Sequence, residues 1–137
     1  MEGSEEKIKL DIDFNKNYEA EDNLEILKLK KENVHVFKLP PMSSSAGHVA
    51  SDFVDLVFKG IMKMTLKGES MIIYFLNPNN TVYLVSLIDE NVNRFVLDVT
   101  GSSRYFSIRA INEQGMASWY GVGKYIIEFK FYCLFSF

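Results

Sequence analysis

The stretch GSSRYFSIRAINEQGMASWYGVG, residues Gly101 to Gly123, decides the fold of this 137-residue chain. Two runs within it, 104–111 and 116–122, are rich in aromatic and β-branched side chains, which favour strands. The polar segment Asn112-Glu113-Gln114-Gly115 separates them and ends in glycine, which is typical of a tight turn. The pattern predicts two antiparallel strands joined as a hairpin.

Similar runs predict strands along most of the chain. We expect them at residues 24–30, 34–39, 60–66, 70–76, 81–87, 95–99, 104–111 and 116–122. Pro40-Pro41 cannot continue a ladder, Lys67-Gly68 offers a positive φ, and Asn77-Pro78-Asn79-Asn80 is dense in turn formers. Seven strands follow from Val34 onward, and short connections make successive strands antiparallel neighbours. The sequence therefore predicts a mainly β chain, a seven-stranded antiparallel barrel or sandwich of the pleckstrin-homology type.

Alternation assigns faces to two of these strands. The rows expected to point inward are Met62, Met64 and Leu66, and Phe106, Ile108 and Ala110. The rows expected to point outward are Ile61, Lys63 and Thr65, and Arg104, Ser107 and Arg109. We expect the inward rows to form the core and the outward rows to lie outside it.

Composition indicates one globular domain, because 47% of the residues are hydrophobic and 24% are charged. The net charge of −3 gives no general attraction to nucleic acid, and we expect no nucleic-acid partner. A lone cysteine, Cys133, cannot form an intramolecular disulfide. The acidic first residues lack the apolar core of a signal peptide, so a cytoplasmic protein is expected.

The chain divides into three segments. Residues 1–23 carry eight acids and are expected to form a flexible leader, although the alternating residues 8–14 leave one added strand open. Residues 24–124 are expected to form the domain, and residues 125–137 are an apolar, divergent tail. That tail would make only ~20 Å of helix, short of the roughly 30 Å hydrocarbon core, so we expect no membrane anchor.

Several short motifs carry a resemblance to a known family. They are Ser102-Ser103-Arg104-Tyr105-Phe106 with Gly121-Val122-Gly123, the strand Val34 to Leu39 with its Pro-Pro stop, Ala50-Ser51-Asp52-Phe53 and Lys67-Gly68. In these residues the chain resembles the NECAP family, the adaptin ear-binding coat-associated proteins of clathrin-mediated endocytosis. The resemblance covers roughly residues 24–124, and Ser102 to Phe106 is its most specific part.

The resemblance implies a pleckstrin-homology-like domain whose open end is plugged by a C-terminal helix. After Gly123 the chain departs from the family, because residues 124–137 replace an Asp-Arg turn and an Asp-Ala-Phe-Asp-Phe helix. The expected helix is thus truncated or divergent. Two explanations remain open: a misjoined reading frame, or a divergent helix or extra strand that fills the same end of the barrel.

For function, the resemblance implies a non-enzymatic accessory module of clathrin adaptors. Its implied partners are the heterotetrameric clathrin adaptor complex and accessory proteins with Phe-Asp-Phe-type motifs, in coated pits and coated vesicles, with only peripheral membrane contact through the coat. The matching positions Ser102, Ser103, Arg104 and Tyr105 are implied partner contacts, although a serine at such a turn also bonds its own backbone. The family's Trp-x-x-Phe tail motif is absent from this sequence, so we expect no ear binding through a tail.

Cationic residues suggest a further part of the site. Lys63, Lys67, Arg104 and Arg109 form either a solvated face or a site for an acidic or phosphorylated peptide, which Arg binds bidentately. Phosphoinositide binding is the alternative function. It is weakly supported, because the connection between the first two strands of the barrel contributes only His48 and, at its end, Lys59.

No pattern in the sequence indicates an enzyme, a cofactor or a metal site. His35 and His48 lack metal-ligand spacing, and Ser43, Ser44 and Ser45 have no adjacent base. Gly121-Val122-Gly123-Lys124 lacks the flanking residues of a phosphate loop. We expect His48 to be an ordinary or satisfied histidine, and Asp52 and Asp55 to be solvated.

Overall fold

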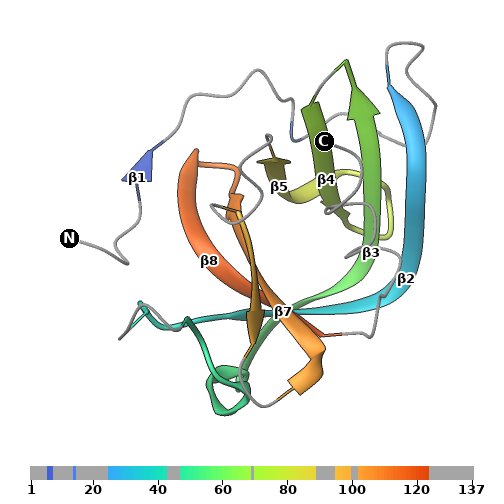
Figure 1. The fold of residues 1–137 in the computed structure, drawn as a ribbon. Coiled ribbons are helices and arrows are strands. Elements are labelled where there is room, and N and C mark those ends of the chain that lie inside the picture. Colours follow the sequence, from blue (N-terminus) through green and yellow to red (C-terminus); the bar gives the residue numbers. More distant parts are fainter. Residues whose placement is uncertain are drawn as a thin grey trace.

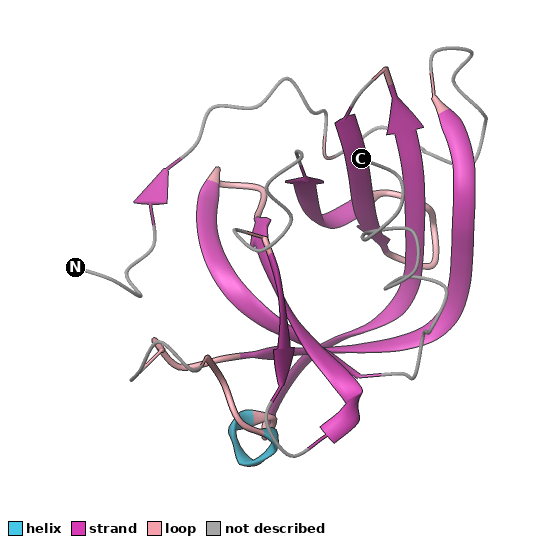
Figure 2. Ribbon diagram, viewed as in Figure 1, coloured by secondary structure: helices cyan, strands magenta, loops and turns pink. Residues whose placement is uncertain are grey.

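The computed structural model describes residues 6–7, 14, 25–42, 47–68, 70–88, 95–99 and 102–123. Within this part the chain is almost entirely strand, and its one helical segment is the 3₁₀ turn η1 (Ala50–Asp52) (Figures 1 and 2). The strands are β1 (Glu6–Lys7), β2 (Ile26–Lys38), β3 (Asp55–Lys67), β4 (Ser70–Leu76), β5 (Val82–Ile88), β6 (Val96–Val99), β7 (Ser102–Ile111) and β8 (Met116–Gly123).

The strands form one antiparallel sheet in the order β1-β8-β2-β3-β4-β5-β7-β6. An additional β7–β8 pairing closes the sheet into a barrel, with β6 held on β7 alone. The β5–β7 seam has a single residue pair, Val85 with Ile111. From β2 to β8 there are seven antiparallel strands, which confirms the mainly β, pleckstrin-homology-like fold. The expected C-terminal helix falls in residues 124–137, outside the described residues.

The predicted strands at 24–30 and 34–39 are one strand, β2, and the separation between them was wrong. Asn33 adopts a positive φ of 58°, and the register with β3 shifts between Lys31 and Val34. Asparagine tolerates the left-handed region, so the irregularity bends the strand without ending it. Figure 1 shows β2 curving along β3 and then across to β8.

The turns at Gly68 and Gly115 form where the sequence predicts them, and both glycines have a positive φ. Gly68 has a φ of 61° between β3 and β4, and Gly115 has a φ of 81° between β7 and β8. In the second turn the side-chain oxygen of Asn112 accepts hydrogen bonds from the backbone N–H groups of Gln114 and Met116, each at 3.0 Å. The hairpin predicted from residues 101–123 is therefore confirmed.

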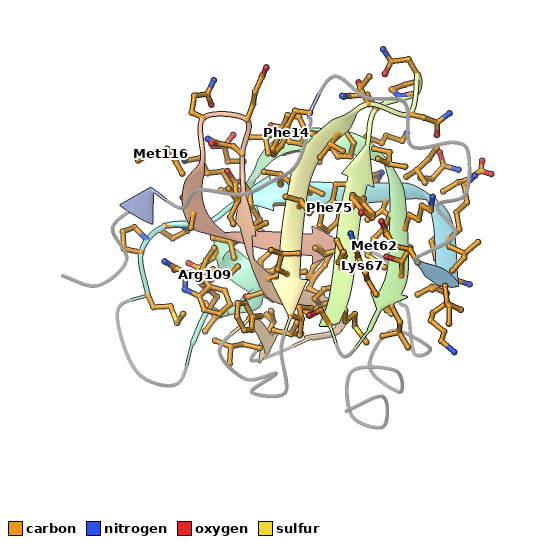
Figure 3. The ribbon with its side chains drawn as sticks, turned by 90° about the horizontal axis from the view of Figure 1, so that it is seen from above. Phe14, Met62, Lys67, Phe75, Arg109 and Met116 are labelled. Atoms are coloured by element: carbon orange, nitrogen blue, oxygen red, sulfur yellow. The ribbon has the colours of Figure 1, made fainter. Side chains whose placement is uncertain are left out.

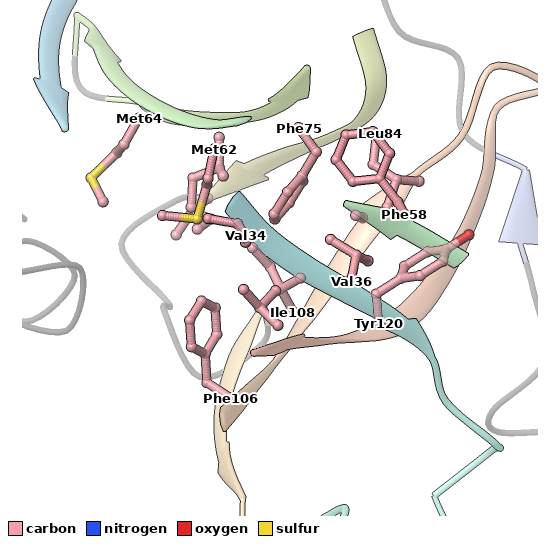
Figure 4. Packing of buried hydrophobic residues seen from close by; sticks show 14 of the residues in the cluster. Val34, Val36, Phe58, Met62, Met64, Phe75, Leu84, Phe106, Ile108 and Tyr120 are labelled. Atoms are coloured by element: carbon pink, nitrogen blue, oxygen red, sulfur yellow. The ribbon is translucent and has the colours of Figure 1, made fainter. Parts of the chain in front are cut away.

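The barrel interior is filled by the predicted inward rows. Met62, Met64, Ile108 and Ala110 are fully buried and Phe106 nearly so. They form one cluster with residues of β2, β4, β5 and β8, and the cluster includes Val34, Val36, Phe75, Leu84 and Tyr120 (Figure 4). The hydrophobic face predicted from alternation is thus the core.

The outer face of the barrel is only partly open to solvent. Lys63 is 9%, Thr65 2% and Ser107 0% exposed, although all three lie on outward rows. Two further apolar clusters cover this face. The outer cluster is Ile72, Tyr74, Leu76, Val82, Val85, Ile111 and Ala117, with Phe14 packed against it. The loop cluster is Leu39, Phe53 and Val99, with Phe37, Ala50 and Tyr105 packed against it.

Candidate functional site

Two of the motifs that carry the family resemblance meet at the loop cluster. Phe53, directly after η1, stacks on Tyr105 of β7 with ring centroids 4.6 Å apart. Phe37 of β2 completes the aromatic group, 5.5 Å from Phe53 and 6.1 Å from Tyr105. Figure 2 shows the 3₁₀ turn close to the start of β7. The segment 50–53 therefore lies against the segment that begins with Ser102.

The rings of Phe53 and Tyr105 pack directly on the backbone of the Gly-x-Gly motif of β8. A Cβ atom at Gly121 would lie 2.3 Å from the ring of Phe53, and one at Gly123 would lie 2.7 Å from the ring of Tyr105. Real Cβ contacts are never this short, so only glycine allows the aromatic rings to lie directly on the strand. The motif has a packing role at the candidate site, and no phosphate group is needed to explain it.

His48 anchors the connection between β2 and β3 to the barrel. The side chain is 2% exposed, its Nε2 donates to the carbonyl oxygen of Pro40 at 2.7 Å, and Ser107 Oγ lies 3.4 Å from its Nδ1. The ring of Trp119 packs 6.5 Å away, centroid to centroid. Asp52 also stabilises this connection, because its Oδ2 accepts a hydrogen bond from the Val49 N–H at 3.0 Å. His48 is thus a satisfied histidine, as predicted.

Apolar side chains at the end of this connection are exposed. Val54 is 82%, Leu56 52% and Val49 40% exposed. Leu56 lies opposite Phe37 in the β2–β3 register, so both side chains lie on the same face of the sheet. Val54 follows Phe53 directly in the sequence. Together they extend the loop cluster to the surface, which sequence reasoning missed because residues 54–59 were assigned to a loop.

The residues carried over from the family lie next to this surface. Ser102, Ser103 and Arg104 begin β7, where Ser102 lies opposite Val99 of β6, and only their backbone is described. Tyr105 is half-buried in the aromatic group. The structure therefore brings the start of β7 together with η1 and the exposed residues that follow it.

The predicted cationic residues do not form one patch. Lys63 and Lys67 belong to β3 and Arg109 to β7, and β4 and β5 lie between these strands in the sheet. Figure 3 shows Lys67 and Arg109 on opposite sides of the barrel. Lys67 is exposed at the β3–β4 turn, Lys63 is buried on the outer face, and Arg109 is half-buried. Of this set, Arg109 shares the outer face of β7 with Tyr105.

A second surface on the outer face was not predicted. Register pairs connect Lys63, Tyr74, Val85, Ile111 and Ala117 in one continuous row across β3, β4, β5, β7 and β8. Phe14 packs on this outer cluster, and its carbonyl oxygen accepts from the Val82 N–H at 3.3 Å. The available signal was the alternation of residues 8–14, which left one added strand open.

Glu25 lies on the same face as the outer cluster. Its carboxylate accepts hydrogen bonds from Thr65 Oγ1 at 2.7 Å and from the Tyr74 hydroxyl at 2.9 Å. These bonds join the residue before β2 to β3 and β4. They also explain how a threonine and a tyrosine hydroxyl are accommodated on a face that is largely covered.

Tyr83 has a perturbed phenol near the start of β3. Its ring stacks on Phe58 with centroids 4.5 Å apart, and its hydroxyl donates to the carbonyl oxygen of Val57 at 3.5 Å. Burial raises the pKa of Tyr83 above 10.0, and the negative charge of Asp55 adds to the increase. Both effects favour the neutral phenol at ordinary pH.

The described part of the chain offers no group of three metal-ligating side chains. It also holds no helix that could serve as a membrane span. What remains at the candidate site is an aromatic and apolar surface beside the start of β7, and a second apolar surface with Phe14 on it. Both are suited to contacts with a polypeptide.

Comparison with known proteins identifies a matching family. Residues 24–125 match the model of a family described as a protein of unknown function, DUF1681. Adaptin ear-binding coat-associated protein 2 of Rattus norvegicus is 29% identical over 96 residues, covering 68% of this chain and 36% of the relative.

Two forms of adaptin ear-binding coat-associated protein 1 are also similar. The Homo sapiens protein is 30% identical over 96 residues, covering 68% of this chain and 35% of the relative. The Mus musculus protein is 30% identical over 107 residues, covering 76% of this chain and 39% of the relative. The chain thus spans little more than a third of the length of these curated relatives. It belongs to the NECAP family of adaptin ear-binding coat-associated proteins.

Proposed function

We propose that this chain is a non-enzymatic accessory module of clathrin-coat assembly, which binds the heterotetrameric adaptor complex and short acidic, aromatic peptide motifs. The observation that carries the proposal is the family match over residues 24–125. Its relatives are named for adaptin ear binding and for association with coats. The proposed place of action is the cytoplasmic side of coated pits and coated vesicles, with membrane contact only through the coat.

The geometry supports a partner surface at the start of β7. Family-matching residues Ser102, Ser103, Arg104 and Tyr105 lie beside the loop cluster, and exposed Val54 and Leu56 extend it. Exposed apolar side chains on a rigid aromatic base are typical of protein interaction sites. We assign contact with the adaptor complex to this surface.

The cationic residues belong to a separate part of the proposal. Lys63 and Arg109 border the outer cluster, and Lys67 lies at the end of β3. A lysine or arginine beside an apolar surface suits a peptide in which acidic residues alternate with aromatic residues. The apolar surface contacts the aromatic ring of the peptide, and the cation pairs with its carboxylate. We assign peptide binding to Lys63 and Arg109, since Lys67 lies on the far side of the barrel from Arg109.

A non-enzymatic role fits the polar groups of the described residues. Both ring nitrogens of His48 have protein partners within the barrel, which leaves neither available as a base. Ser107, its neighbour, is fully buried. A nucleophile and base that converge on an accessible position are thus not formed by these residues.

Phosphoinositide binding is the less supported alternative. Residues 39–54, which connect β2 and β3, include no lysine or arginine. His48, the remaining basic candidate in this connection, is buried under the loop. A headgroup site needs several cations that converge on the phosphates, and this connection does not supply them.

The test compares the two functions directly. The chain is immobilised and exposed either to purified heterotetrameric adaptor complex or to vesicles with and without a phosphoinositide. We expect saturable capture of the adaptor complex, and the same low vesicle binding in both compositions. Vesicle capture that depends on phosphoinositide, without capture of the adaptor complex, would replace the proposed function by the alternative.

A further inference from the structure

The outer cluster already holds an aromatic side chain from a distant part of the sequence. Phe14 is half-buried against this cluster, whose residues belong to β4, β5, β7 and β8. Phe14 lies outside residues 24–125, which match the family model. The outer cluster therefore belongs to the matched domain, and the aromatic ring that packs on it comes from the segment before that domain. Figure 3 shows Phe14 at the rim of the barrel, above the strands that carry the cluster.

The contact combines a main-chain hydrogen bond with an anchoring side chain. A main-chain hydrogen bond of 3.3 Å runs from the Val82 N–H to the Phe14 carbonyl oxygen, while the ring contributes the apolar contact. Earlier in the chain, Glu6 and Lys7 pair with Ala117 and Met116 of β8. Main-chain bonds to strands combined with an anchoring side chain are a common mode of peptide recognition.

The cationic residues beside the outer cluster are opposite in charge to the acidic residues that precede Phe14 in the sequence. Lys63 pairs with Tyr74 at one border of the row, and Arg109 lies on the outer face of β7, two residues before Ile111. Phe14 itself is preceded in the sequence by Asp11 and Asp13. Glu25 is already held by Thr65 and Tyr74 on the same face, so this face accepts carboxylates.

We propose that the outer cluster is the docking site for a peptide in which a phenylalanine follows acidic residues, and that Phe14 occupies this site in cis. The proposal rests on the proposed function, because it locates the surface that takes the acidic, aromatic peptide motifs. An occupant on the same chain competes at a high effective concentration. It therefore lowers the apparent affinity for a peptide in trans.

The test uses the full chain and a labelled peptide that copies residues 8–16, IKLDIDFNK. Fluorescence anisotropy measures its affinity for the wild-type chain, for Phe14→Ala, and for Ile26→Ala as a control on an exposed side chain that lies opposite Leu66. We expect Phe14→Ala to bind the peptide roughly tenfold or more tightly than wild type, and Ile26→Ala to match wild type. A peptide with alanine in place of its phenylalanine should bind none of them. Equal affinity for wild type and a folded Phe14→Ala chain would overturn the proposal.

A second measurement keeps the test valid if Phe14→Ala does not fold. Wild-type chain is titrated with the same peptide at high concentration, and backbone amide signals are followed by NMR. We expect shifts at Val82 and Ala117 and none at Gly60, which lies opposite Val34 in β3. Shifts elsewhere without change at Val82 would overturn the proposal. Adaptor capture without peptide binding would reject this site alone, whereas loss of both would reject the proposed function.

Discussion

Phe53 and Tyr105 stack nearly parallel, with ring centroids 4.6 Å apart and planes inclined by 23°. The contact joins the connection after β2 to the start of β7. It thereby joins two of the motifs that carry the family resemblance. Because both rings lie on glycine residues of β8, the position of the connection depends on the absence of two Cβ atoms. Through these contacts the Gly-x-Gly motif supports the surface that we propose for adaptor binding.

The first prediction concerns Gly121. We expect Gly121→Ala to destabilise the fold by about 1–3 kcal/mol, because the new methyl group overlaps the Phe53 ring and forces it outward. Urea unfolding of the single variants and of Gly121→Ala with Phe53→Ala measures the coupling between the two sites. Additive effects in the double variant would contradict a direct clash with that ring.

The second prediction concerns His48. We expect His48→Ala to cost about 1–3 kcal/mol, since it removes the partner of the Pro40 carbonyl oxygen and leaves a cavity beneath the loop. His35→Ala is the matched control, because His35 is only half-buried on β2. Chemical denaturation compares the two variants. A smaller loss of stability for His48→Ala than for His35→Ala would show that His48 does not anchor the connection.

The third prediction concerns alkaline pH. The pKa of Tyr83 is raised in the folded chain above the unfolded value of 10.0, so folding favours the neutral phenol. This stabilisation is complete below pH 10 and is lost as the pH rises through the folded-state pKa. We expect the difference in unfolding free energy between wild type and Tyr83→Phe to change in this range, with wild type losing more stability. A difference that is constant from pH 8 to about 11.5 would contradict the assignment.

The fourth prediction concerns the cations. We expect Arg109→Glu to weaken binding of an acidic, aromatic peptide by about 1–3 kcal/mol, because it replaces a charge-assisted contact with repulsion. Lys67→Glu is measured alongside it, since Lys67 lies on the far side of the barrel. Calorimetry gives both affinities, and thermal unfolding confirms that each variant is folded. We expect Lys67→Glu to bind as wild type does, and unchanged affinity of a folded Arg109→Glu chain would contradict the proposed role of Arg109.

The strands and their inward faces could be predicted from the sequence, because alternation and turn residues are local signals. Met62 and Ile108 point inward as expected, and Gly68 and Gly115 have the positive φ of their turns. The division of β2 was wrong because Asn33 is a turn former that here only bends a strand. Local preference was overridden by pairing with β3.

The covering of the outer face could not be predicted in the same way. Ser107 is buried and lies next to the His48 ring, and Phe14 packs against the outer cluster. Both contacts join residues far apart in the sequence, for which a single chain carries no periodic signal. The residues at the start of β7 could therefore be named as candidates from the sequence, whereas the surfaces that surround them could not.

Binding of the adaptor complex to matched surface variants tests the central claim most directly. Leu56→Asp adds a charge beside the loop cluster, while Leu27→Asp places the same change on a comparably exposed leucine near the start of β2. We expect Leu56→Asp to reduce the affinity for purified adaptor complex by about tenfold or more, since it places a charge in an apolar contact, and Leu27→Asp to bind as wild type does. Equal affinity of all three folded proteins would contradict the assigned surface, and absence of adaptor binding by the wild-type chain would contradict the proposed function itself.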